Sequence, residues 1–376
     1  MFGGITDFSR LPDNMSPMNR RLREGQRSVH QEASSRILKE RSRGDFEWVT
    51  LPSGPSPRLD AGAVQIGHSL YCIAGYESQE HVLSVVDRFD LARCRWADQI
   101  PIPTGMPQSH LALACEGDRY IYSAGGQLGP RCCPAVADVF AFDTLDRVWL
   151  SLPPLPESRY AATMQFWRGR LHVLGGSRPD RYTPASEHWS LGVGNGRAAE
   201  RRWRVEPPIP RGGMHRASAV VDDRLYVFGG QEGDFIAVPG DPNFTCTGDT
   251  VECIYADVYE LDQVNDDWER LPDMPLPSSH NEFSVVVDGH LVFVVGGSCY
   301  KDPQTFDIEL TDVIQVFDTR ARTWALGGHL PFRVKTCLTA LYDGWLYMSA
   351  GQRDRGPDDP RPGAVESGMW RARLIS

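Results

Sequence analysis

One short phrase recurs along this chain and limits the folds that it can adopt. In its clearest copy, residues 224–230 (RLYVFGG), a run of apolar residues ends at two glycines. Weaker copies end at Gly75-Tyr76 and at Ala350-Gly351. The phrase occurs six times. The second residue of its terminal pair, which we call the mark of the repeat, lies at positions 76, 126, 176, 230, 297 and 351. A repeat of about fifty residues predicts one structural unit per mark, each packed against its neighbours.

The repeats share an internal order. The glycines are followed by a loop, a short apolar segment that is often closed by aspartate, and then usually a tryptophan, as in residues 142–149 (FDTLDRVW). A proline-rich link comes next, for example residues 152–156 (LPPLP). Short, nearly continuous apolar segments are typical of strands buried on both faces. The repeat therefore predicts four short strands, with glycines where inner strands end and a tryptophan filling the space between outer strands.

This order predicts an all-β fold, a six-bladed β-propeller. Residues 369–374 match the third strand of a repeat, and no tryptophan strand follows them. The matching strand is found around Trp48, in residues 47–52 (EWVTLP). We expect this N-terminal strand to close the last blade and to cover strand edges that would otherwise be exposed. The propeller is expected over residues 46–376, after a basic, disordered or marginally helical segment at 1–45.

Composition argues against some classes of partner. The chain of 376 residues has a formal net charge of −10, and an acidic surface is poorly suited to nucleic acid. Its apolar runs are far shorter than the roughly 20 residues that cross a bilayer as a helix. We therefore expect a monomer that has no transmembrane span and that binds a protein, a carbohydrate or a small molecule.

The cellular compartment has two interpretations. Nine cysteines, with no CxxC pair, are typical of reduced thiols, and no charged-then-apolar signal segment opens the chain. These features favour the cytoplasm. However, Asn243-Phe244-Thr245 is a glycosylation sequence beside Cys246 and Cys253, which favours the secretory pathway.

Polar residues are concentrated where a propeller forms its ligand-binding mouth. That mouth is built from the loops that approach each innermost strand and from the loops that follow the glycine pairs. The candidate ligand-binding residues are Arg58, Asp60, His110, Arg159, Tyr160, His215, Arg216, Gln231, Glu232, Asp234, His280, Glu282, Arg333, Lys335, Gln352 and Arg353. They predict an arginine-rich pocket for a carboxylated or polyhydroxylated molecule or an acidic peptide loop, with residues 231–256 as a lid. Alternatively, about half of these arginines and histidines hydrogen-bond carbonyl groups of the next blade.

Two functions follow from the same mouth. In the first, the propeller binds a protein or glycan without catalysis. In the second it is a small-molecule enzyme, a sugar isomerase or mutarotase, or a cyclase or lyase. His110, His215 and Glu282 would then move protons, and arginines would hold an anionic substrate. The histidines are on different blades, so their spacing indicates no metal site, and no cofactor is expected.

Several phrases carry a family resemblance: residues 208–216 (PIPRGGMHR), 229–235 (GGQEGDF), 330–335 (LPFRVK) and 351–359 (GQRDRGPDD). With them the chain resembles the kelch-repeat β-propeller family, and more narrowly the plant kelch-repeat-containing proteins of the galactose oxidase/kelch superfamily. The resemblance covers about residues 46–376. It implies a kelch propeller. Those relatives typically begin with a signal-anchor segment and are associated with the secretory pathway, so the resemblance also implies an association with the secretory pathway or Golgi.

Overall fold

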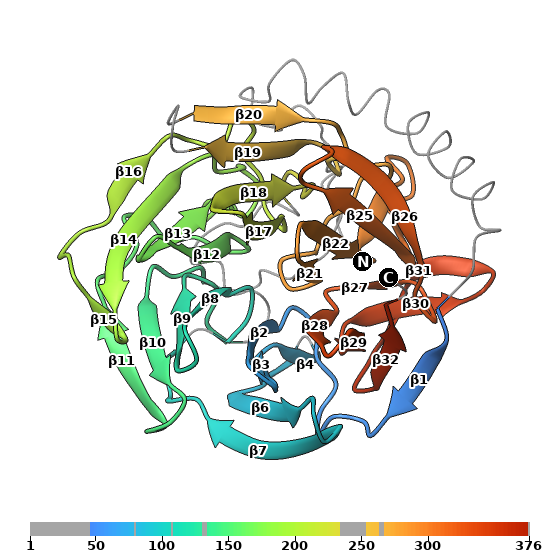
Figure 1. The fold of residues 1–376 in the computed structure, drawn as a ribbon, viewed down its shortest axis with the longest axis horizontal. Helices are drawn as coiled ribbons and strands as arrows, with labels where there is room; N and C mark the ends of the chain where they lie inside the picture. Colours follow the sequence, from blue (N-terminus) through green and yellow to red (C-terminus); the bar gives the residue numbers. More distant parts are fainter. Residues whose placement is uncertain are drawn as a thin grey trace, which may run out of the picture.

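The computed structural model describes residues 46–78, 80–106, 108–129, 134–233, 253–262 and 267–374. In these ranges every regular element is a β-strand, and the larger sheets surround a central axis as blades (Figure 1). The all-β propeller predicted from the sequence is confirmed. The segment 1–45 lies outside the described residues.

Each blade is an antiparallel sheet whose first strand lies nearest the axis. Blade 1 contains β2 (Gly62–Ile66), β3 (Ser69–Ile73), β6 (Val85–Asp90) and β7 (Arg95–Pro101). Blade 2 contains β8 (Ala112–Glu116), β9 (Tyr120–Ala124), β10 (Val139–Asp143) and β11 (Val148–Leu152). Blade 3 contains β12 (Thr163–Trp167), β13 (Arg170–Leu174), β14 (His188–Gly194), β15 (Arg197–Ala198) and β16 (Arg204–Glu206).

The remaining blades follow the same order around the ring. Blade 4 contains β17 (Ala217–Val221), β18 (Arg224–Phe228), β19 (Val258–Asp262) and β20 (Asp267–Leu271). Blade 5 contains β21 (Val285–Asp288), β22 (Leu291–Val295), β25 (Val313–Asp318) and β26 (Thr323–His329). Blade 6 contains β28 (Leu338–Tyr342), β29 (Trp345–Ser349), β32 (Met369–Arg373) and, from the other end of the described chain, β1 (Trp48–Leu51). In this last pairing Trp48 lies opposite Ala372 and Leu51 opposite Met369.

Smaller sheets form from the loops that follow the glycine pairs, joined in blade 6 by β27 (Val334–Lys335) from the approach loop. They are β4 (Tyr76–Ser78) with β5 (His81–Val82), β23 (Ser298–Lys301) with β24 (Ile308–Leu310), and β27 with β30 (Gln352–Gly356) and β31 (Asp359–Val365). They add hairpins at the end of the axis where the glycine pairs turn.

The glycine pairs join one blade to the next. Both residues of each pair have positive φ, 62° and 85° at Gly175 and Gly176. The N–H of the second residue donates a hydrogen bond to a carbonyl of the next blade's approach loop. These N–H to O distances are 2.7 Å for Gly75 to Gln108, 2.8 Å for Gly126 to Arg159, 2.8 Å for Gly176 to Gly213, 2.7 Å for Gly230 to Ser278, 2.8 Å for Gly297 to Val334 and 2.8 Å for Gly351 to Arg58.

In blade 1 the turn lies one residue earlier than the sequence predicted. In blade 1 the positive-φ pair is Ala74-Gly75, at 55° and 95°, and not Gly75-Tyr76. Ala350-Gly351 has nearly the same angles. Alanine therefore replaces the first glycine of a pair, whereas the second is glycine in every blade. A Cβ on Gly176 would lie 2.7 Å from the carbonyl oxygen of Tyr160, a backbone atom that cannot easily move.

The outer strands are linked by their tryptophans. In five blades an indole Nε1–H donates to a backbone carbonyl at the outer end of the preceding blade. The pairs are Trp48 with His329 (2.8 Å), Trp96 with Pro52 (3.0 Å), Trp203 with Pro153 (2.9 Å), Trp268 with Pro207 (2.9 Å) and Trp324 with Pro272 (2.9 Å). Each ring thus packs between blades while its only polar group is satisfied.

Two buried histidines lie in the middle strands of blade 3. His172 Nδ1 and His188 Nε2 are 2.9 Å apart, so one neutral ring donates to the other. His172 also packs against Trp167, and His188 against Trp268 of blade 4. Burial lowers the pKa of His172 to about 3 and that of His188 to about 4. Both imidazoles are therefore neutral in the folded protein at neutral pH.

We predict that Gly176→Ala destabilises the protein much more than Gly169→Ala. Both glycines are in blade 3 with positive φ, but nothing lies within 4 Å of a Cβ at Gly169. The control should lose about 1 kcal/mol from the backbone conformation alone. Gly176→Ala adds the clash with Tyr160 and should lose roughly 3 kcal/mol or more. Urea unfolding measures both losses, and equal losses would contradict the role assigned to the second glycine.

We also predict that stability falls as pH falls from about 6.5 to about 4. Below pH 6.5 the unfolded chain protonates His172 and His188, while the folded protein keeps them neutral, so protons favour unfolding. At pH 5 this amounts to roughly 2 kcal/mol for each imidazole. The double variant His172→Gln/His188→Gln should lose most of this pH dependence in urea unfolding. The exposed His290→Gln should retain it, and an unchanged slope in the double variant would refute the assignment.

Candidate functional site

Six residues at equivalent positions surround the axis at one end of the inner strands. They are Asp60, His110, Ala161, His215, His280 and Thr336, and all have positive φ between 49° and 63°. We call them the axial ring. The residue before each one pairs with the residue after a glycine pair, as Met214 does with Gln231. The glycine turns therefore fix the backbone of the ring.

Backbone hydrogen bonds run around this ring from blade to blade. His110 N donates to Asp60 O (3.1 Å), Ala161 N to His110 O (3.1 Å), His215 N to Ala161 O (3.0 Å), His280 N to His215 O (3.1 Å) and Thr336 N to His280 O (3.2 Å). The ring geometry thus depends on main-chain atoms. Its side chains take no part in these bonds.

Blade 5 differs from the other blades next to the ring. Two extra residues, Glu282 and Phe283, form a turn between His280 and the inner strand β21. Asn281 supports this turn, because its side-chain amide donates to the carbonyls of Val295 and Gly296, each at 3.1 Å. The insertion brings Glu282 and Phe283 to the axis, where both line a narrow pocket on the ring side and a wider channel along the inner strands.

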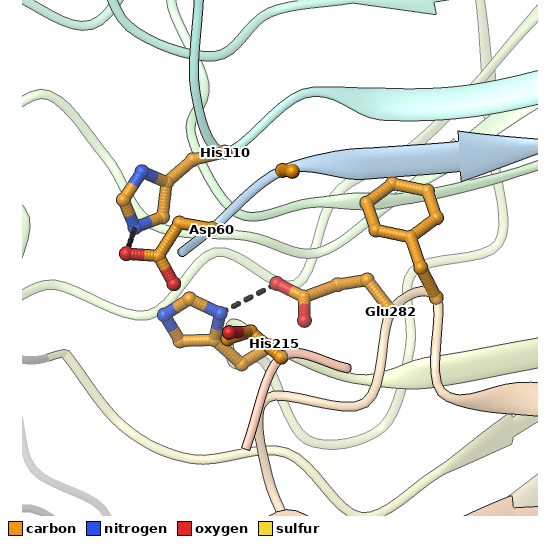
Figure 2. Close-up of a pocket in the computed structure, with 7 residues that line it drawn as sticks. Asp60, His110, His215 and Glu282 are labelled. Carbon is orange, nitrogen blue, oxygen red and sulfur yellow. Dashed lines mark hydrogen bonds and ion pairs between the residues drawn. The ribbon is translucent and has the colours of Figure 1, made fainter. Parts of the chain in front are cut away.

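The narrow pocket brings together two carboxylate–imidazole pairs (Figure 2). His215 Nδ1 lies 2.5 Å from Glu282 Oε1, and His110 Nε2 lies 3.4 Å from Asp60 Oδ2. The centroids of the two imidazoles are 5.6 Å apart. Ala61, Phe283 and Thr336 complete the lining. This arrangement can accept hydrogen bonds from a ligand and can exchange protons with it.

His280 lies behind the pocket and orients His215. The two rings stack with centroids 3.8 Å apart and an interplanar angle of 14°. The Ser279 hydroxyl lies 3.0 Å from His280 Nδ1 and donates to Gln231 Oε1 at 2.6 Å. The stack therefore holds the plane of His215 so that its Nδ1 faces Glu282.

Comparisons with known proteins agree with the fold. The family model described as the KLHDC2/KLHL20/DRC7 Kelch-repeats domain matches residues 61–297. A kelch repeat-containing protein of Arabidopsis thaliana is 43% identical over 330 residues, covering 88% of this chain and 76% of that protein. The chain belongs to the kelch-repeat family. The resemblance inferred from the sequence is thus confirmed, and kelch propellers are generally protein-interaction domains.

More distant relatives share less with this kelch propeller. The kelch-like protein terF of Aspergillus terreus is 21% identical over 319 residues, which cover 81% of this chain and 64% of that protein. A solved structure described as "Structure of YjhT" superposes with a TM-score of 0.64 at 13% identity, over 85% of this chain and 95% of that one. The structural match establishes a shared fold.

Most of the predicted ligand-binding arginines of the kelch propeller are held in ion pairs outside the pocket. Arg58 pairs with Asp87 and donates to the carbonyl of Ala74. Arg216 pairs with Asp257 at 2.9 Å, and Arg333 pairs with Asp354 at 2.8 Å.

Arg159 has two carboxylate partners and an aromatic one. It contacts Glu157 at 3.0 Å and Glu187 at 3.5 Å and lies over the Trp189 ring. Burial lowers its pKa from the ordinary arginine value. Like Arg58 and Arg216, it fastens an approach loop to a carboxylate of its own blade.

The other predicted residues do not line the pocket. The Tyr160 hydroxyl contacts the carbonyl of Arg181 at 3.2 Å, Glu232 accepts from Cys253 N at 3.3 Å, and Arg353 lies over Phe332 and near Glu366. Lys335 and Gln352 pair through their backbones. Asp234, and most of the predicted lid, lie outside the described residues.

The sequence prediction missed Thr336 and Phe283. Thr336 was detectable, because it precedes Gly351 by the same 15 residues that separate His215 from Gly230. Phe283 was detectable from the two extra residues between His280 and Gly297. In the described part of the chain, no group of three or more His, Cys, Asp or Glu is placed to hold a metal ion. No helix there has the length and apolar character needed to cross a bilayer.

We predict that Arg216→Ala acts mainly on stability. Arg216 and Asp257 are 1% and 2% exposed, and the buried Arg211 also binds Asp257 at 2.8 Å, so Arg216→Ala removes one of the two arginine partners of this carboxylate. Loss of this charge-assisted hydrogen bond and of the packed side chain should cost about 2 kcal/mol in urea unfolding. The half-buried Arg353→Ala should lose less than about 1 kcal/mol. Equal stability of the two variants would contradict the structural role of Arg216.

Proposed function

We propose that this kelch propeller binds a protein or glycan ligand through its loop face, at the central mouth formed by the axial ring. One observation carries the proposal. Side chains from blades 1, 2, 4 and 5 (Asp60, His110, His215 and Glu282) meet around one pocket, on a ring whose backbone is already held by hydrogen bonds. Preorganised polar groups of this kind suit recognition, because little ordering remains to be done on binding.

Arrays of immobilised glycans and peptides test this proposal. The full chain is expected to bind a limited set of spots, and His215→Ala should weaken that binding at least tenfold. Alanine is compatible with the backbone at this position, because Ala161 has nearly the same φ in the same ring. Arg168→Ala, an exposed substitution in the hairpin between β12 and β13, should leave binding unchanged. Unchanged binding by His215→Ala would contradict a site at the mouth.

The two carboxylate–imidazole pairs also favour a second function, proton transfer on a small molecule. A short His215–Glu282 contact facing the His110–Asp60 pair is an arrangement suited to an acid and a base. A sugar isomerase, mutarotase, cyclase or lyase would use it. NMR of sugars and sugar acids in D₂O detects such turnover. An enzyme should accelerate anomer exchange or solvent deuterium incorporation and should lose this activity in Glu282→Gln, whereas equal rates with and without protein would reject the enzyme.

A further inference from the structure

Resting on the proposed function, we infer that the axial pocket receives a protonated primary amine, the end of a lysine side chain of a protein partner. The inference concerns the seven residues that line the pocket and the charges that they bring. The pocket would bind the end of the lysine side chain, and the surrounding loops would bind the rest of the partner.

The charge of the lining favours a cation. Among the residues that line the pocket, Asp60 and Glu282 are carboxylates, and neither arginine nor lysine is present. Arg58 and Arg216, from the neighbouring approach loops, are paired with Asp87 and Asp257. An anionic ligand group would therefore face two carboxylates, each with an imidazole beside it, whereas an ammonium group would be attracted by both carboxylates.

A buried hydroxyl gives independent support. Thr336 is 8% exposed and lines the pocket. Its Oγ1 makes no hydrogen bond to any other residue in the described part of the chain. A buried polar atom without a partner is unfavourable in a folded protein and marks a position for a ligand or an ordered water. The Thr336 backbone is held by His280, so the hydroxyl keeps its position in the pocket.

The acceptors match an ammonium group in number. Asp60, Glu282 and the Thr336 hydroxyl come from blades 1, 5 and 6 and provide three acceptor groups around one space. A lysine ammonium has three N–H donors and no acceptor, whereas a hydroxyl has one donor. Ala61 and Phe283 add apolar surface beside these acceptors. Acetylation removes the charge and two donors, so it should abolish the match.

Ligand-observed NMR with Nα-acetyl-lysine methylamide and the full chain tests this inference. For a ligand of this size we expect a Kd on the order of 1 mM. The Nε-acetylated compound and the norleucine analogue should bind at least tenfold more weakly. Asp60→Asn and Glu282→Gln should each weaken lysine binding about tenfold, and Thr336→Ala about threefold. Glu366→Gln, a carboxylate outside the pocket, is the control, and melting temperatures confirm that each variant folds.

The outcomes separate this inference from the proposed function. Equal binding of the lysine and norleucine compounds, or no saturable binding of either, would overturn the lysine inference. Array ligands that contain no lysine or amine but require His215 would also overturn it, while supporting binding at the mouth. If every pocket variant binds the array ligands as well as the unmodified protein does, the proposed function itself would be rejected.

Discussion

The whole structure depends on the turn made by the second residue of each glycine pair. At Gly176 and Gly230 a Cβ would lie 2.7 Å from the carbonyl oxygen of Tyr160 and of Met214, so only glycine fits. The N–H of the same residue donates to the next blade. One residue thus ends an inner strand, allows close approach of the preceding approach loop, and joins two blades. Six such turns, with the strand β1 paired to β32, connect the blades around the ring.

The candidate site is a consequence of those turns. They hold the approach loops close to the axis, and the resulting backbone hydrogen bonds leave six side chains facing one end of it. In a ring built in this way the side chain at each position can vary without changing the scaffold, as Ala161, His215 and Thr336 show with nearly equal φ. The chemistry of the mouth is therefore set by single residues. In blade 5 it is also set by the inserted Glu282 and Phe283.

The fold was predictable because its determinants are local. Glycine pairs, tryptophans and proline links recur in the sequence, and each acts within its own turn or against the adjacent blade. The first mark was placed one residue late, because Ala74 occupies a position where glycine was expected. The site was harder to predict. An arginine in an approach loop has the same sequence context whether it faces a ligand or a carboxylate, and the partners Asp87 and Asp257 are about 30 and 40 residues away.

The same pairing explains the charge of the pocket. Arg58, Arg159 and Arg216 carry positive charge into the approach loops, and carboxylates on or beside the third strands of their blades neutralise it. Two of these carboxylates have a second arginine partner, because Arg211 also binds Asp257 and Arg178 also binds Glu187. Asp60 and Glu282 have the imidazoles of His110 and His215 beside them instead. The residues that line the axial pocket include no arginine, so its two carboxylates can attract a cationic ligand group.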